Sequence, residues 1–263
     1  MKTAHGLTGS SRRRLTRLTS ASSEDRFLSP MLAPRFALDT KTLSGADLHL
    51  DIAGLTARSA RRKRRDALWA SIVESGCSIA ARLPPHCRLA LPLDSVETPP
   101  DDLILHLATS LTATKLDASR LELEFGENTL ASENDTLFYA LAALHDLGVG
   151  LVFAGLGAGV TSLTLLRDRA FTGLLSALKL DRQILLRLHT VAEAEPPLIR
   201  AIVRFGADFG LTTRADGVDC PETLAFLTDI GCAEGRGAAL GRAETVSRFL
   251  STHGFGDKAH DEG

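Results

Sequence analysis

The chain has 263 residues, of which 44% are hydrophobic and 24% charged, as in a globular protein that buries a large core. It contains no apolar run of about 18 residues, so no membrane-spanning helix is predicted. The single Trp and single Tyr argue against an aromatic platform for single-stranded nucleic acid. The four cysteines form no C-x-x-C pair, which argues against a zinc site or a disulfide framework and predicts a reduced, cytoplasmic protein.

The charge is distributed unevenly along the chain. Residues 1–65 carry 14 Lys and Arg against 5 Asp and Glu, whereas the remainder is acidic. Residues 1–33 are rich in Arg and Ser and show no hydrophobic period, so they predict a disordered basic tail. An alternative is that Met31 is the natural start. Residues 254–263 predict a flexible C-terminal tail, which leaves 34–253 as the folded domain.

Short apolar runs alternate with helical patterns from residue 34 onward. Strands are predicted over residues 35–38, 47–52, 88–91, 121–125, 150–154, 174–178 and 211–213, with a weaker one near Cys232. Helices are predicted over residues 61–81, 101–112, 133–147, 196–209, 220–230 and 243–250. This alternation predicts a parallel α/β fold. Roughly eight strands favour a (β/α)8 barrel over a doubly wound sheet, and functional residues would then follow the strand ends.

Six segments carry a resemblance to a known family. The stretch LVFAGLGAGVTSL at residues 151–163 resembles the motif ALDDFGTGYSSL of EAL domains, which are barrel phosphodiesterases that hydrolyse the bacterial messenger cyclic di-GMP. Five more segments resemble family motifs in the same order: GADL at 45–48, LELEFGE at 121–127, LKLDR at 178–182, ADGVD at 215–219, and GC with RG between 231 and 237. The resemblance implies an EAL-type (β/α)8 barrel of the TIM type.

The family holds two metal ions with carboxylates and an Asn amide, and these ions activate a water for attack on the phosphodiester. In this sequence Ala154 and Gly155 stand where the resemblance places an aspartate pair, and Pro92 stands at the Asn position. The EAL glutamate is shortened to Asp47. We therefore expect no Mg²⁺ cofactor and no catalytic residues.

Substrate contacts are altered as well. Asp51 stands where the family has an Arg that contacts a phosphate. One unit-charge contact at about 4 Å is worth roughly 4 kcal/mol near a protein surface, so this reversal disfavours the nucleotide. Two further glutamates are shortened to Asp216 and Asp219, and a Gln is replaced by Arg236.

Glu124, Glu127, Lys179 and Asp181 are unchanged from the family motifs. The vestigial site combines three of these with two of the shortened residues and consists of Asp47, Glu124, Lys179, Asp181 and Asp216. The resemblance makes Glu124 a metal ligand and places Lys179 beside the attacking water. The residues themselves favour a structural interpretation, because a buried Lys needs a carboxylate partner, and Glu124 or Asp181 would serve.

A basic run spans the start of the first predicted helix and consists of Arg58, Arg61, Arg62, Lys63, Arg64 and Arg65. One interpretation is a solvated helix start. The other is a docking surface for an acidic partner, nucleic acid or an anionic membrane. The helix lacks a broad apolar face for lying on a membrane, and no helix-turn-helix or zinc-finger pattern is present.

These observations predict a catalytically inactive EAL signalling protein that acts by binding another regulatory protein. The resemblance adds that the family often dimerises through helices at the barrel mouth, so a homodimer is one expected partner. The alternatives are a cyclic di-GMP receptor that binds without hydrolysing and, behind it, a residual phosphodiesterase.

Overall fold

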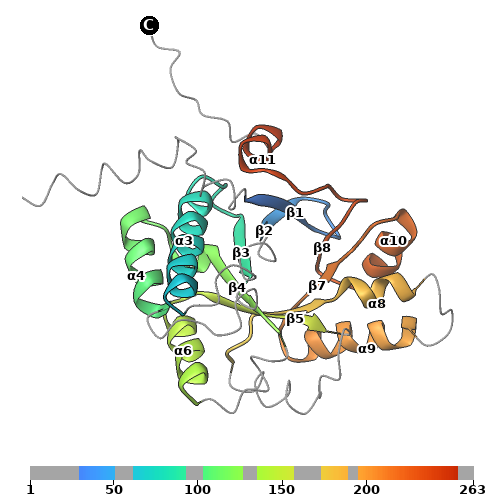
Figure 1. Ribbon diagram of the computed structural model, residues 1–263. Helices are drawn as coiled ribbons and strands as arrows, with labels where there is room; N and C mark the ends of the chain where they lie inside the picture. Colours follow the sequence, from blue (N-terminus) through green and yellow to red (C-terminus); the bar gives the residue numbers. More distant parts are fainter. Residues whose placement is uncertain are drawn as a thin grey trace, which may run out of the picture.

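Nine strands form one sheet that closes into a barrel in the computed structural model, which describes residues 30–50, 62–92, 103–126, 135–156, 173–188 and 195–253. The strand order is β2-β3-β4-β5-β6-β7-β8-β1-β9, and the additional pairing of β2 with β1 closes an eight-stranded ring (Figure 1). The strands are β1 (Met31–Ala37), β2 (Leu43–His49), β3 (Arg88–Pro92), β4 (Leu121–Phe125), β5 (Gly150–Leu156), β6 (Ala177–Leu180), β7 (Thr212–Asp216), β8 (Glu234–Arg236) and β9 (Glu244–Thr245). The predicted eight-stranded barrel is confirmed.

The first strand departs from the expected all-parallel arrangement. Strands β2 to β8 pair in parallel, but β1 is antiparallel to both β2 and β8. Residues 38–42 alone connect β1 to β2, and so short a connection makes a hairpin, because a parallel crossover needs a dozen or more residues. Strand β1 begins at Met31, three residues before the predicted start of the domain at 34.

Helices surround the barrel on its outer side. They are α3 (Arg62–Ala80), α4 (Leu103–Thr114), α6 (Asp135–Asp146), α8 (Arg182–Arg187), α9 (Glu195–Asp208), α10 (Pro221–Asp229) and α11 (Val246–Thr252), with a 3-10 turn at Ala118–Arg120. Helices α3, α4 and α6 gather on one side and α8, α9 and α10 on the other, while α11 lies near β1 (Figure 1). Helix α8 was not predicted, because its six residues are too few to show a period.

Several strands differ from their predicted bounds, and in β6 and β8 the reason is that inward residues are charged. Strand β6 was expected to end at Leu178, yet it spans Ala177–Leu180 and includes Lys179. Strand β8 has the sequence Glu-Gly-Arg, with no apolar side chain to mark it. Apolar runs do not mark these two strands fully, because charged side chains point into the barrel interior.

The apolar core lies between the barrel and the helices. On β4 and β5, Leu121, Leu123, Phe125, Leu151 and Phe153 are all at most 1% exposed and belong to this core. Alternate residues of a strand point to opposite faces, so Glu122 and Glu124 point into the barrel. The strands are therefore apolar outside and charged inside.

No helix in the described ranges is long and apolar enough to cross a membrane. No disulfide links the four cysteines. Burial raises the pKa of Cys77 and of Cys232 to about 12, so both remain thiols at neutral pH.

The position of this core predicts that Phe125→Ala lowers the free energy of unfolding by about 3–5 kcal/mol, since it leaves a cavity beside Phe153. The matched change Leu105→Ala on α4, where the side chain is 66% exposed, should lower it by less than about 0.5 kcal/mol. Urea unfolding followed by circular dichroism measures both. Equal losses would contradict this assignment of the core.

Candidate functional site

The interior of the barrel is lined with charged side chains from six strands. They are Arg35 on β1, Asp47 on β2, Glu122 and Glu124 on β4, Lys179 on β6, Arg214 and Asp216 on β7, and Glu234 and Arg236 on β8. Some contacts join neighbouring strands, such as that of Arg35 with Asp47. Others join strands that are not neighbours in the sheet and run across the interior, such as those of Glu122 with Arg35 and Arg214. Two groups form, one deep in the barrel and one at the mouth, where the parallel strands end.

The inner ion cluster consists of Arg35, Glu122, Arg214 and Glu234. Arg214 donates hydrogen bonds of 2.6 and 2.9 Å to the two carboxylate oxygens of Glu122, and Arg35 donates one of 2.8 Å to Glu122 Oε2. The Nε atoms of both arginines form ion pairs with Glu234 Oε2, at 3.1 and 2.7 Å, without the alignment of a hydrogen bond. Each charge in this cluster is neutralised within it or by Asp47.

Glu122 is fully buried but stays ionised. Burial alone would raise its pKa, yet the charges of Arg35 and Arg214 outweigh burial and lower the pKa to about 2. Glu122 is therefore a carboxylate at neutral pH.

The mouth cluster consists of Asp47, His49, Glu124, Lys179, Asp216 and Arg236. Lys179 Nζ donates to Asp47 Oδ2 at 2.7 Å and to both oxygens of Glu124, at 2.7 and 2.9 Å. Asp47 also accepts a 2.8 Å hydrogen bond on Oδ1 from Arg35, which joins the two clusters. Both oxygens of Asp47 and both oxygens of Glu124 are thus held by side-chain cations.

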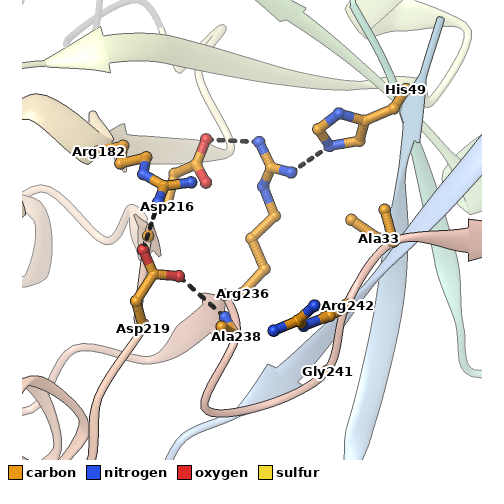
Figure 2. Close-up of a pocket in the computed structure, with 12 residues that line it drawn as sticks. Ala33, His49, Arg182, Asp216, Asp219, Arg236, Ala238, Gly241 and Arg242 are labelled. Carbon is orange, nitrogen blue, oxygen red and sulfur yellow. Dashed lines mark hydrogen bonds and ion pairs between the residues drawn. The ribbon is translucent and has the colours of Figure 1, made fainter.

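Arg236 lies at the centre of the mouth cluster. Its Nε is 2.9 Å from Asp47 Oδ2, and its two terminal nitrogens contact Asp216 Oδ2 and His49 Nε2. Figure 2 shows the guanidinium between the Asp216 carboxylate and the His49 ring. A single cation therefore bridges β2 and β7.

Protonation in the mouth cluster follows from these contacts. Burial would raise the pKa of Asp47, but Lys179, Arg236 and Arg35 hold it well below its usual value. Burial would lower the pKa of Lys179, but Asp47 and Glu124 outweigh it and raise the pKa. Asp47 is consequently a carboxylate, and Lys179 keeps its proton at neutral pH.

Burial, and after it the charge of Arg236, lower the pKa of His49. At neutral pH the ring is therefore uncharged, and its Nε2 accepts from the guanidinium when the proton sits on Nδ1.

A pocket of about 420 Å³ opens beside Arg236. It is lined by Ala33, His49, Arg182, Asp216, Gly217, Asp219, Arg236, Gly237, Ala238, Gly241, Arg242 and Ala243. Arg182 forms a 2.7 Å ion pair with Asp219, which also accepts a hydrogen bond from the Ala238 amide (Figure 2). Among the described residues, Arg242 has no ion-pair partner, and it is exposed. The small residues make room for a ligand, and the arginines give the wall a cationic character.

The structure brings together four of the five vestigial-site residues, namely Asp47, Glu124, Lys179 and Asp216. Asp181 lies apart from them. Its Oδ1 accepts a 2.7 Å hydrogen bond from the Gln183 amide and caps α8, which is a structural role. Of the two partners expected for Lys179, Glu124 is therefore the one that the structure supplies.

Sequence reasoning missed Arg35, His49, Glu122, Arg214 and Glu234. A usable signal was present for Glu122, which stands two residues before Glu124 and therefore on the same face of β4. For the two arginines no comparable signal exists, because their partners lie far away in the chain.

No side chain of the basic run is among those that the structure describes. Arg58 and Arg61 lie in the segment 51–61, which the structure does not describe, and for Arg62, Lys63, Arg64 and Arg65 only the backbone at the start of α3 is described. Asp51 also lies in that segment.

The donor set does not fit the two metal ions that the fold implies. Pro92, Ala154 and Gly155 offer no side-chain oxygen, and among the described residues no three His, Cys, Asp or Glu side chains lie close enough to share an ion. A second cation about 4 Å from a side-chain cation would be repelled by roughly 4 kcal/mol per unit of charge.

The inner cluster predicts that Arg35→Met lowers the free energy of unfolding by about 3 kcal/mol or more, because it leaves Asp47 and Glu122 buried with fewer counter-charges. Arg88→Met is the matched control. The Arg88 side chain contacts the same Glu122 at 3.6 Å but is 52% exposed. Its replacement should therefore lower the free energy of unfolding by less than about 1 kcal/mol. Urea titration of both variants checks the difference, and equal effects would refute it.

Acid should destabilise the folded protein by protonating Glu122. The pKa of Glu122 is about 2 in the folded chain against 4.5 in the unfolded chain, so its stabilisation is complete above about pH 4.5 and is lost as the pH falls towards 2. This difference corresponds to ~3 kcal/mol. Unfolding free energies measured between about pH 6 and about pH 3 should fall with pH. A flat profile would contradict the ionised cluster.

Comparison with known proteins gives a consistent picture. A family model described as EAL domain matches residues 28–243. Uncharacterized protein y4lL of Sinorhizobium fredii is 30% identical over 68% of this chain and 21% of its own length. Cyclic di-GMP phosphodiesterase PA2567 of Pseudomonas aeruginosa is 30% identical over 52% of this chain and 23% of its own length. The chain thus spans less than a quarter of these relatives.

Solved structures share the fold. The PaMucR phosphodiesterase in its c-di-GMP complex has a TM-score of 0.75 at 22% identity and matches 90% of this chain and 100% of that one. The EAL domain of Mycobacterium smegmatis DcpA has a TM-score of 0.71 at 20% identity, over 87% of this chain and 96% of that one. At these identities the similarity establishes the barrel alone.

Proposed function

The chain belongs to the EAL domain family, and from that premise we propose that it is a regulatory member that acts in the cytoplasm by binding another protein and does not hydrolyse cyclic di-GMP. One observation carries the proposal. The carboxylates at the barrel mouth are already neutralised by Lys179 and Arg236 of the same chain. The absence of a disulfide among the four cysteines is in keeping with a reducing compartment.

Hydrolysis of a phosphodiester needs an activated water, and none of the mouth residues that the structure describes is suited to activate one. Lys179 keeps its proton because its pKa is raised, so it cannot accept one from water. Both oxygens of Glu124 hold Lys179, and Pro92, Ala154 and Gly155 bring no ligand for a metal. These residues therefore support the proposal that the site does not hydrolyse a phosphodiester.

The partner is proposed to be a signalling or regulatory protein with an acidic face. The support is the basic run, in which six of the eight residues 58–65 are Lys or Arg. Such a density of one charge favours association with an oppositely charged surface. A second copy of this chain is the other partner to be tested.

A second candidate is a receptor that binds cyclic di-GMP without hydrolysing it. The observation that favours it is the pocket of about 420 Å³ beside Arg182, Arg236 and Arg242, since guanidinium groups bind phosphates well. Asp216 and Asp219 line the same pocket and oppose an anionic ligand. This is why the protein-binding role ranks first.

We expect that cyclic di-GMP is not consumed by the purified protein in Mg²⁺ or Mn²⁺, as measured by chromatography of the nucleotide. Calorimetric titration up to about 100 µM nucleotide, with Mg²⁺ and with chelator, should give no heat of binding. A dissociation constant below about 10 µM, or roughly 7 kcal/mol, would make the receptor the better proposal. Turnover that disappears in Glu124→Ala would overturn both proposals.

The partner is tested by chemical cross-linking in cells, with the full chain as bait and mass spectrometry as readout. Replacing Arg61–Arg65 by Ser should abolish the specific cross-links. Replacing Arg200 and Arg204 on α9 is the control, because these exposed arginines lie outside the basic run and should leave the cross-links unchanged. Retention of every partner in the first variant would refute the docking surface.

A further inference from the structure

Three potential metal ligands surround one guanidinium at the barrel mouth. Asp47 Oδ2 lies 2.9 Å from Nε of Arg236, while Asp216 Oδ2 and His49 Nε2 contact its terminal nitrogens. Figure 2 shows Arg236 reaching across the pocket to Asp216 on one side and His49 on the other. The groups converge because β2 and β7 both end at this mouth.

Two carboxylates and one imidazole are a ligand set that suits divalent transition metals such as Mn²⁺. Within the described residues no such trio is close enough to share an ion, because the broad guanidinium stands between its members. The same groups that would bind a divalent cation therefore bind an arginine.

We infer that the guanidinium of Arg236 is a built-in cation that occupies a latent divalent-metal site made by Asp47, His49 and Asp216, so that removal of this one side-chain charge opens the site to Mn²⁺. The inference rests on the proposed function in one respect, namely that the unaltered mouth holds no divalent ion.

Burial and charge support this role for Arg236. Its side chain is only 13% exposed, and that of Asp47 is 4% exposed, so the carboxylate has little water to replace a lost partner. Without Arg236 the mouth would hold the carboxylates of Asp47, Glu124 and Asp216 against the single positive charge of Lys179, with Arg35 shared from below. Such an excess of negative charge attracts a divalent cation.

An entry route also exists. Asp216, His49 and Arg236 all line the pocket of about 420 Å³, so an ion can reach the site from solvent. Asp216, whose side chain is 26% exposed, has room to move toward an ion once the guanidinium has gone.

The test compares Mn²⁺ binding to the intact chain and to Arg236→Gln. Free Mn²⁺ has a six-line paramagnetic resonance spectrum that is lost on binding, and thermal unfolding with and without Mn²⁺ gives a second readout. We expect Arg236→Gln to bind one Mn²⁺ per chain with a dissociation constant of about 1 mM or tighter, and to melt at a higher temperature in its presence. The intact chain should bind at least about tenfold more weakly.

Two controls identify the site. Arg242→Gln removes the same charge from the same pocket without vacating the space between the carboxylates, so it should leave Mn²⁺ binding as weak as in the intact chain. Arg236→Gln combined with Asp216→Asn should lose the binding gained by Arg236→Gln alone. Equal binding by Arg236→Gln and Arg242→Gln would overturn the inference, because general loss of charge would then explain the gain.

The remaining outcomes separate this inference from the proposed function. If the intact chain itself binds Mn²⁺ tightly at the mouth, the inference and the basis of the proposed function both fail. If neither the intact chain nor a folded Arg236→Gln binds, the inference fails and the proposed function stands. If Arg236→Gln does not fold, Arg236→Met keeps the apolar stem packed. Failure of both to fold even in Mn²⁺ would also overturn the inference, because an ion that can take the place of the arginine would restore the fold.

Discussion

The rest of the structure depends on the burial of Arg35 inside the barrel. Its side chain is 2% exposed, and it contacts Asp47 and Glu234 on the two neighbouring strands and Glu122 on β4 across the ring. A buried charge without partners is strongly unfavourable, so these carboxylates must all reach the same point. Closing the sheet into a barrel brings them there. The closed ring and its interior ions therefore require one another.

The same arrangement continues to the mouth and determines what the mouth can do. Lys179 and Arg236 neutralise the carboxylates that an EAL barrel presents at this end, in the way that Arg35 and Arg214 neutralise those below. Each interior carboxylate that the structure describes therefore has at least one side-chain cation as its partner. These ion pairs tie the ends of β2, β4, β6, β7 and β8 to one another at the mouth.

Much of the site was predictable, although for two different reasons. The pattern of strands and helices predicted the barrel, and the motif resemblance located Asp47, Glu124, Lys179 and Asp216, which the structure brings together. The motif also included Asp181, but this residue caps α8 instead. A motif records neighbours along the chain, and it does not say which neighbour turns inward at the end of a strand.

The sequence by itself determined the barrel and its apolar outer faces, because these follow from local periodicity. The motif resemblance, also read from the sequence, implied that positions 92, 154 and 155 lack the side-chain oxygens of the family. Only the tertiary structure decided the antiparallel placement of β1 and the pairing of ions inside the ring. Arg35 and Glu122 are 87 residues apart in the chain, and Lys179 and Asp47 are 132 apart. Contacts at such separations are set by closure of the sheet, which no local pattern of residues encodes.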